Sequence, residues 1–331
     1  MPNFVDCAVF QPFSTEDLPR RSSLRAGLGI PEAAFVVGCV AAVKKDHKRI
    51  DYLIREFRQW AVGSEQLAVS REQMTVNREE SAASSLPTAD CLLPAIPSLP
   101  TVHCPLPTVA PFLLIAGAKT GETTELLALA ESLIPGRYKI VTDCSRAQMP
   151  ELYRAMDVFV LTSLFEMMPI ALLEALASGL PCLVNRHPVL EWMVGVERQT
   201  ADIRPQTVDQ GEENTPHPSP LPQGARVQNA HALVSPGLLP LPSRERVGVR
   251  GSSAFRSNVC SLGVVVSPAP GGMSLDMSQA QALAQVLAGL TPEWIELYGR
   301  QARERAVKMF STEAVIGQYV EYYKKIVRCE T

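Results

Sequence analysis

The strongest constraint on this chain is a regular alternation of short apolar runs with segments of helical spacing. The runs FVVGCVAAV (35–43) and VFVLTS (158–163) are rich in β-branched residues and show no polar alternation. Three further runs have the same character: FLLIAG (112–117), YKIVTD (138–143) and PCLVN (181–185). Strands of this kind are buried on both faces, which is typical of a parallel sheet covered by helices. We therefore predict an α/β fold, a Rossmann-like parallel sheet with helices on both faces.

The connecting helices are predicted from apolar residues at helical spacing. In DYLIREFRQW (51–60), Leu53, Ile54, Phe57 and Trp60 share one helical face. The remaining helices are predicted at residues 122–133, 149–156, 169–179, 278–290, 292–310 and 312–327. Ligands of sheets built in this way bind at the carboxyl ends of the strands. A functional site is therefore expected in the loops that follow the strands.

Two long segments interrupt this alternation. Residues 86–111 and 205–251 are rich in proline and show neither a strand period nor a helix period. Proline lacks an N–H donor and fixes φ, so such segments do not join a packed core. We treat residues 64–110 and 198–262 as insertions that are expected to be disordered. The predicted domain is one unit over 1–331, with a core formed by residues 1–63, 111–197 and 263–330.

Charge and apolar content exclude several classes of protein. The 331 residues carry a formal net charge of −3, without the basic footprint of a nucleic-acid-binding protein. No apolar run approaches the roughly 18 residues that span a bilayer. The start, MPNFVDCAVFQPF, lacks the features of a secretory signal. None of the eight cysteines forms a CxxC pair, so we expect the reduced thiols of a cytoplasmic protein.

Two carboxylates stand in a stretch that otherwise has the composition of a core, LFEMMPIALLEALASGLPCLV (164–184). Pro169 suits the first position of a helix and Gly179 suits its C-terminal cap. Glu166 then falls in the loop before this helix, at the carboxyl end of a strand. Glu174 falls on the second turn of a helix that is apolar on all sides and therefore expected to be buried.

A buried carboxylate requires a partner, because an unpaired buried charge is unfavourable. For Glu174 the partner could be a structural donor or the hydroxyl groups of a ligand, such as the vicinal diol of a ribose. The backbone amides at 167–169 and the helix dipole suit a phosphate group. The alternative is that Glu166 is a surface acid and Glu174 is salt-bridged within the core. The residues alone leave both readings open.

The spacing in this stretch is similar to the signature of family 4 glycosyltransferases of the GT-B fold. The pattern E-x7-E followed by A-x-A-x-G-x-P is formed here by Glu166, Glu174, Ala175, Ala177, Gly179 and Pro181. Other stretches resemble the family in the same order: NFVDCAVFQP (3–12), FVVGCVAAVKKDHKRIDYLIREF (35–57), LLIAG (113–117), AMDVFVLTSLFE (155–166) and FSTEAVIGQYVEYY (310–323). The resemblance covers everything outside the two insertions. It implies the single C-terminal, donor-binding half of a retaining GT-B enzyme.

The resemblance also implies roles for individual residues. Glu174 would bind the ribose of the nucleotide, Lys48 would neutralise the diphosphate, and Glu166 would contact the donor sugar. Lys48 and Glu166 are therefore the predicted catalytic residues. The predicted donor-binding residues are Glu174, Met167, Met168, Pro169, Gly38, Lys44, Arg49 and Gly117. No metal and no cofactor are expected, since a cation and a helix N-terminus together stabilise a leaving diphosphate.

Three departures from the family pattern bear on activity. The family's Arg after the glycine of the first strand falls at Cys39, which cannot clamp a phosphate, so the cations at 44–49 would have to compensate. Met167 and Met168 stand where the family has glycine and an aromatic residue, which would reshape the sugar pocket. The chain begins at the family's hinge, so a separate N-terminal domain would supply much of the acceptor site.

We predict a glycosyltransferase that transfers a sugar from a nucleotide sugar to an acceptor, with this chain carrying the donor-binding half. Its partners would be the nucleotide sugar, a carbohydrate or lipid-linked acceptor and a separate N-terminal GT-B domain. It would reside in the cytoplasm, with peripheral attachment to the inner membrane face as a further option. Two alternatives remain open: an inactive or truncated nucleotide-sugar-binding fragment, and a GT-B-type sugar-nucleotide epimerase.

Overall fold

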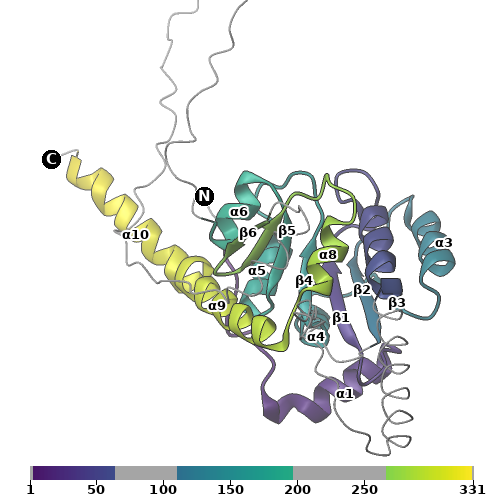
Figure 1. Ribbon diagram of the computed structural model, residues 1–331. Helices are drawn as coiled ribbons and strands as arrows, with labels where there is room; N and C mark the ends of the chain where they lie inside the picture. The colour runs from purple at the N-terminus through teal and green to yellow at the C-terminus, as the bar shows by residue number, and fades with distance from the viewer. Residues whose placement is uncertain (1–2, 64–109, 197–265, 330–331) are drawn as a thin grey trace, which may run out of the picture. The chain divides into compact units, whose positions relative to one another are not determined.

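The computed structural model of this protein describes residues 3–63, 110–196 and 266–329. The two proline-rich insertions predicted from the sequence lie almost entirely outside these ranges. The described residues all belong to one compact unit. Its centre is a seven-stranded sheet flanked by helices (Figure 1).

The strands of the sheet follow the order β3-β2-β1-β4-β5-β7-β6. They are β1 (Phe35–Val40), β2 (Pro111–Gly117), β3 (Tyr138–Thr142), β4 (Val158–Leu161), β5 (Cys182–Asn185), β6 (Val266–Ala269) and β7 (Gly272–Leu275). All neighbouring strands pair in parallel except β6 and β7, which pair antiparallel. The five strands predicted from the apolar runs are confirmed.

The sheet is parallel as predicted, apart from the antiparallel pairing of β6 with β7 at one edge. Strands β6 and β7 come from the sequence VSPAPGGMSL (266–275), whose prolines and glycines are typical of a turn. An edge strand tolerates Pro268, because the missing N–H removes no hydrogen bond from a central ladder. Gly272 has a φ of 141°, and a Cβ there would lie 1.9 Å from the carbonyl oxygen of Cys182. Only glycine therefore allows β7 to pair closely with β5 at this point.

The helices agree with the predicted ones, with two additions. They are α1 (Leu18–Gly27), a helix at 50–63, α3 (Thr123–Leu133), α4 (Met149–Ala155), α5 (Ile170–Ala177), α6 (Pro188–Val194), α8 (Ala282–Ala288), α9 (Pro292–Phe310) and α10 (Thr312–Cys329). Helices α1 and α6 were not predicted, and α8 begins four residues later than the predicted 278. Short 3-10 turns span Thr15–Asp17 and Arg146–Gln148.

The hydrophobic core has two layers, one on each face of the sheet. Residues of one strand alternate between them: Val37 belongs to one layer and Val36 to the other. The helix at 50–63, α3 and α8 cover the first face, whereas α4, α5 and much of α9 cover the second (Figure 1). Strands buried on both faces explain why the runs in the sequence are apolar throughout.

The side of the sheet on which successive strands are added changes at β1. From this strand the chain proceeds outward through β2 and β3, then returns to the other side of β1 to form β4 and β5. The loops after β1 and β4 consequently start side by side at the carboxyl edge and diverge. In open α/β sheets such a switch point is where ligands bind.

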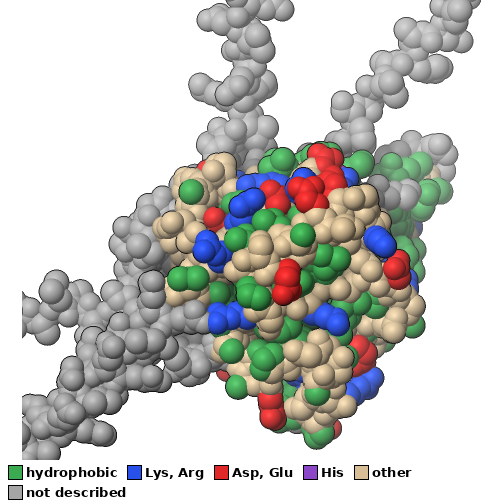
Figure 2. Space-filling view, turned by 90° about the vertical axis from the view of Figure 1, so that its right-hand side faces the viewer, with side chains coloured by type: hydrophobic (Ala, Val, Ile, Leu, Met, Phe, Trp, Pro, Cys, Tyr) green, Lys and Arg blue, Asp and Glu red, His purple; other side chains and the backbone are tan. Residues whose placement is uncertain are grey.

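The surface shows no concentration of one charge on the face seen in Figure 2, where acidic and basic side chains are interspersed. Within the described residues, no helix is both long enough and apolar enough to cross a membrane.

Candidate functional site

The loops that follow β1 and β4 are tied together at the carboxyl edge of the sheet. The Thr162 hydroxyl donates to the carbonyl oxygen of Lys48 over 2.7 Å. The Leu164 N–H donates to the carbonyl oxygen of His47 over 2.8 Å. From the next strand, β5, the side-chain amide of Asn185 donates to the Ser163 carbonyl over 3.0 Å. Side chains of these loops are thereby held in one small region.

Lys48 and Glu166, the two predicted catalytic residues, meet in this region as an ion pair through Lys48 Nζ and Glu166 Oε1. Their side chains are only 18% and 12% exposed, so the pair is largely withdrawn from water. Glu166 is therefore not a free surface acid. The ring of Phe165 stacks on that of His47 with centroids 5.1 Å apart, which adds an apolar contact between the same two loops.

Glu174 is buried on α5, as the sequence predicted. Its Oε2 accepts a hydrogen bond of 2.9 Å from the hydroxyl of Tyr153, a fully buried residue of the neighbouring helix α4. The same hydroxyl lies 3.1 Å from the carbonyl oxygen of Ala171. The structural-donor reading of Glu174 is therefore correct for one of its two oxygens.

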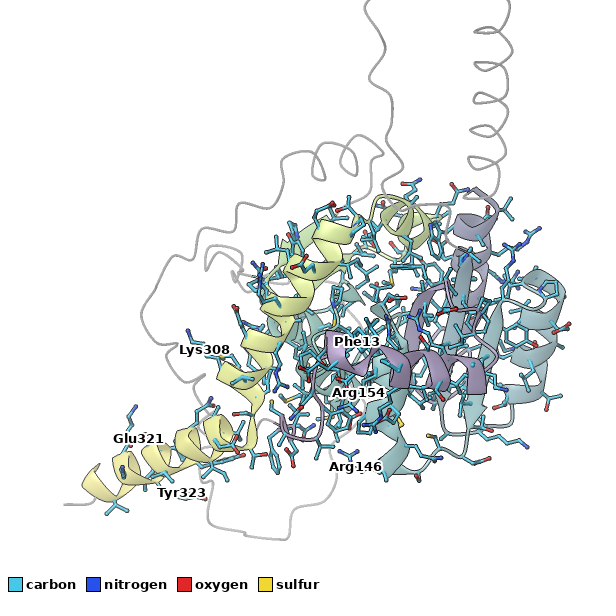
Figure 3. All side chains as sticks on the ribbon, turned by 90° about the horizontal axis from the view of Figure 1, so that it is seen from below. Phe13, Arg146, Arg154, Lys308, Glu321 and Tyr323 are labelled. Atoms are coloured by element: carbon cyan, nitrogen blue, oxygen red, sulfur yellow. The ribbon has the colours of Figure 1, made fainter. Side chains whose placement is uncertain are left out.

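The second oxygen of Glu174 has a different environment. Oε1 lies 3.0 Å from Nη2 of Arg146, whose side chain is 73% exposed against 4% for Glu174. Although this distance is short, Oε1 is buried and accepts no hydrogen bond of good geometry from any described residue. Burial raises the pKa of the Glu174 carboxyl, and Tyr153 and Arg146 oppose that shift. Arg146 belongs to the loop between β3 and α4 (Figure 3).

The segment between Glu166 and Glu174 leads into the N-terminus of α5. Pro169 is the N-cap, with extended backbone angles of φ −69° and ψ 120°, and the helix begins at Ile170. The prediction that Pro169 occupies the first helical position is therefore wrong by one residue. Gly179 has a φ of 70° just beyond the C-terminus, which confirms its predicted capping position.

The two methionines of the segment differ in environment. The Met167 side chain points to solvent and the residue is 89% exposed. Met168 packs partly against the core, and its carbonyl oxygen accepts a 2.8 Å hydrogen bond from the Asn3 side chain. Only Met167 therefore has room to contact a ligand without rearrangement of the loop.

The cations after β1 are directed to different partners. Lys44 Nζ lies 3.6 Å from Asp46, in the same loop. Arg49 donates to the carbonyl oxygen of Met277 over 3.1 Å and stacks over the ring of Tyr52. The guanidinium of Arg49 is therefore engaged away from Lys48 and Glu166. Of the predicted cations, Lys48 alone pairs with a predicted site residue.

The two glycines that were predicted to bind the donor, on β1 and β2, have a packing role. Gly38 lies within β1, where a Cβ would lie 2.1 Å from the sulfur of Met156. Gly117 ends β2, and a Cβ there would lie 1.8 Å from the carbonyl oxygen of Ala41. Both glycines let neighbouring groups approach closely. Cys39 is fully buried and its thiol pKa is raised to about 12 by burial, so it contributes no charge to the edge.

A pocket of about 240 Å³ opens at the same carboxyl edge. Its lining comes from the ends of β2 and β3 and from the start of α4: Gly117, Ala118, Asp143, Cys144 and Met149. Gly117 is the predicted donor-binding residue that lines it. Arg146 lies in the stretch of chain between the lining residues Cys144 and Met149.

Tyr153 and Arg146 were not predicted from the sequence. Tyr153 has the spacing of an ordinary core residue in MPELYRAM (149–156), and its bond to Glu174 joins two separate helices. The requirement that a buried carboxylate be paired pointed to a donor but not to its identity. Among the described residues no cluster of His, Cys, Asp and Glu side chains is arranged to hold a metal ion. The expectation of a metal-free, cofactor-free site stays a prediction.

Two solved structures have a fold similar to that of this chain. Sucrose-phosphate synthase from Thermosynechococcus elongatus superposes with a TM-score of 0.54 and 16% identity, over 99% of this chain and 52% of that one. HepE of Anabaena in complex with UDP and glucose superposes with a TM-score of 0.52 and 14% identity, over 97% and 55%. This chain thus spans about half the length of these proteins. The likeness establishes its fold as that of GT-B glycosyltransferases.

Sequence comparisons find similarity to glycosyltransferases over part of the chain. Residues 106–199 match the family "Glycosyl transferases group 1". A curated Escherichia coli protein, "UDP-Gal:alpha-D-GlcNAc-diphosphoundecaprenol alpha-1,3-galactosyltransferase", is 55% identical over 40 residues, which are 12% of this chain and 10% of that protein. "Putative glycosyltransferase EpsF" of Bacillus subtilis (strain 168) is 57% identical over 35 residues, 11% and 9% of the two chains. The similarity to group 1 glycosyltransferases thus rests on residues 106–199.

Proposed function

We propose that this chain is the donor-binding C-terminal half of a glycosyltransferase that uses a nucleotide sugar. One observation carries the proposal. At the switch point of the sheet, Glu166 of the Lys48–Glu166 pair comes shortly before the N-terminus of α5, and the buried Glu174 lies on the second turn of that helix. A cation, a helix N-terminus and a buried acid match the diphosphate and the diol of a nucleotide.

The arrangement accounts for the chemistry of sugar transfer. The bond between the sugar and the diphosphate breaks as negative charge builds up on the diphosphate oxygens. Lys48 and the first N–H groups of α5, which have no acceptor within the helix, would stabilise that charge. Glu166 would be released from Lys48 as the diphosphate binds, and its carboxylate would then accept hydrogen bonds from the sugar. The reaction needs no redox partner.

Glu174 suits the ribose because a vicinal diol offers two donors to one carboxylate. Its Oε1 is the oxygen available for this purpose, since Oε2 is taken by Tyr153. The pocket beside Arg146 would take the base attached to that ribose. Its position next to the loop of Arg146 supports this assignment, because Arg146 reaches Glu174 from there.

Donor binding is tested by titrating the chain with UDP, GDP and ADP and with the corresponding nucleotide sugars. We expect at least one to bind, and Glu174→Ala to weaken it about tenfold or more, since hydrogen bonds to a charged group are lost. Glu16→Ala, which removes an exposed acid of the first 3-10 turn, is the matched control. If no nucleotide binds, or if Glu174→Ala binds as tightly as the wild type, the assignment of the site is wrong.

The role of Lys48 is tested by comparing ligands with and without phosphate. Lys48→Ala should weaken the nucleoside diphosphate at least about tenfold while leaving the nucleoside nearly unchanged, because the interaction removed is with the phosphate charge. Lys324→Ala, on the exposed part of α10, serves as the control. Equal losses for both ligands would remove the phosphate role from Lys48.

Transfer by this chain is proposed to require a separate N-terminal domain. Two observations support this: the chain spans about half of each structural relative, and α10 exposes an apolar stripe. The exposed residues of this stripe are Ile316, Val320, Tyr323 and Val327. We expect donor binding by the chain alone and transfer only when such a domain is supplied. The same assay separates a transferase from an inactive fragment or an epimerase, and the anomeric NMR signal of the product tests the proposed retention of configuration.

The acceptor is proposed to be a carbohydrate or a lipid-linked sugar. A lipid-linked acceptor is supported by the exposed Leu164, Phe165, Met167 and Ile170 around the site. With such an acceptor the enzyme would work in the cytoplasm, attached to the inner face of the membrane. Flotation with vesicles tests the attachment: the wild type should rise with the vesicles and a Phe165→Ser, Met167→Ser variant should rise less.

A further inference from the structure

The two oxygens of the Glu174 carboxylate face groups that differ in burial, one inside the fold and one largely exposed. Oε2 accepts from Tyr153, which is completely buried. Oε1 faces Arg146, a largely exposed side chain that lies 3.0 Å away without forming a well-aligned hydrogen bond. One oxygen is thus bound to the interior of the fold, and the other is approached from solvent.

Tyr153 is itself fixed. Its ring packs edge-on against Phe10, with centroids 5.8 Å apart, and against Phe159 at 6.0 Å. Its hydroxyl has a single proton and two acceptors within reach, Glu174 Oε2 and the carbonyl oxygen of Ala171. An ionised Glu174 attracts that proton more strongly than a carbonyl does. Tyr153 therefore fixes Oε2, which leaves Oε1 facing Arg146.

Arg146 is attached to the site much more loosely. It belongs to a 3-10 turn whose geometry is set by a capping box between Ser145 and Gln148, not by the contact with Glu174. Ordering a long exposed side chain for one ion pair has an entropic cost that offsets most of the attraction. A ligand that offers two hydroxyl donors to Oε1 can therefore displace Arg146.

From these contacts we propose that Tyr153 is the positioning residue of Glu174, and that Arg146 holds the place of the ribose hydroxyls until a nucleotide binds. The inference rests on the function proposed above and adds two residues to it. Tyr153 keeps its bond to Oε2 in the free and bound forms, whereas Arg146 leaves Oε1 when the diol arrives. The ribose and Arg146 thus compete for one oxygen atom.

The test compares a nucleoside diphosphate with its 2′,3′-dideoxy counterpart, by calorimetry on the full chain. The probe is whichever of UDP, GDP and ADP the wild type binds. The wild type should prefer the ribose form by about tenfold or more, because only this form bonds to Glu174. In Tyr153→Phe the preference should fall to about threefold or less, with the dideoxy affinity nearly unchanged. In Arg146→Met the ribose form should bind a few-fold more tightly and the dideoxy form equally well.

Matched variants control for the substitutions themselves. Tyr138→Phe removes another hydroxyl that bonds to a carboxylate, that of exposed Glu131, and should behave as the wild type. Arg20→Met removes an exposed ion pair with Glu151 and should also have no effect. Because Tyr153→Phe removes one buried hydrogen bond, Arg146→Met, a surface change, gives an independent readout if the first variant does not fold.

Several outcomes would overturn the inference. If Tyr153→Phe weakens both ligands equally, or keeps the wild-type preference, Tyr153 supports the fold without positioning Glu174. If Arg146→Met weakens the ribose form, Arg146 is a ligand contact and not a placeholder. If the wild type binds both ligands equally, Glu174 does not bind the ribose and the inference falls with that part of the proposed function. If no nucleotide binds, the proposed function itself fails.

Discussion

Two ion pairs connect the segment from Glu166 to Glu174 with neighbouring loops, and they differ in burial. In the Lys48–Glu166 pair both side chains are mostly shielded from water. In the Arg146–Glu174 pair the acid is buried and the cation is exposed. The first pair is symmetric, so loss of either partner leaves a shielded charge behind. The second is one-sided, since Glu174 keeps its bond to Tyr153 when Arg146 moves away.

For the proposed donor site, the contrast implies both stability and access for a ligand. The symmetric pair closes the loops after β1 and β4 against each other, and in the proposed function a phosphate would exchange with Glu166 to reach Lys48. The one-sided pair leaves an oxygen that can be exchanged without disturbing the core. The free energies of unfolding of variants of the two pairs test this contrast.

The largest difference in the free energy of unfolding is expected between Lys48→Met and Arg146→Met. Lys48→Met should lower the free energy of unfolding by about 2 kcal/mol, because it leaves the shielded Glu166 without its cation. Arg146→Met should lower it by less than about 1 kcal/mol, as expected for an exposed partner. Urea denaturation measures both. Lys324→Met, which breaks the exposed pair with Glu321 on α10, should have the smallest effect. Equal losses for Lys48 and Arg146 would contradict the contrast.

A smaller difference in stability is expected between variants of the two methionines that lie between Glu166 and Glu174. Met168→Ala should destabilise the protein by about 1 kcal/mol, since its side chain packs partly on the core. Met167→Ala should change stability by less than about 0.5 kcal/mol, because that side chain is in solvent. Thermal unfolding of the two variants provides the comparison. A larger loss of stability for Met167→Ala would contradict the packing of Met168, and not Met167, against the core.

The smallest effect is expected in the pH dependence of stability, because Tyr153 and Arg146 offset part of the burial of Glu174. A carboxyl whose pKa is higher in the folded state than its ordinary value of 4.5 binds more protons when folded. Stability then falls as the pH rises from about 4.5 through the raised pKa. Glu174→Gln lacks this contribution, so the wild type should lose stability relative to Glu174→Gln across that window. The pH dependence of stability of Glu16→Gln should follow that of the wild type. If the stability of Glu174→Gln changes with pH in parallel with that of the wild type, the effect is ruled out.

The sequence predicted those parts of the fold that depend on local patterns. The apolar runs identified β1 to β5, since both faces of these strands are covered. Gly179 was recognised because a helix end with a positive φ favours glycine. Lys48 and Glu166 were assigned to one site because the family resemblance gave them one ligand, and the structure shows that adjacent strands bring them together.

The parts that were missed depend on contacts between distant elements. The strands β6 and β7 contain prolines and glycines whose use becomes clear only beside β5. The bond between Tyr153 and Glu174 requires α4 and α5 to be packed together, which no periodicity reveals. Arg49 is a cation of the same segment as Lys48, so the sequence did not distinguish them. In the structure its guanidinium donates to the carbonyl oxygen of Met277 instead.

The connection from residue 63 to residue 110 joins the sheet at the end opposite the site. Ala110 accepts a hydrogen bond from the N–H of Phe35, the first residue of β1, and Trp60 packs on the ring of Phe35. Lys48 lies beyond the last residue of β1, and Glu166 lies beyond the last residue of the neighbouring β4. A change at either end of this connection is therefore separated from Lys48 and Glu166 by the length of the strands and of the helix at 50–63.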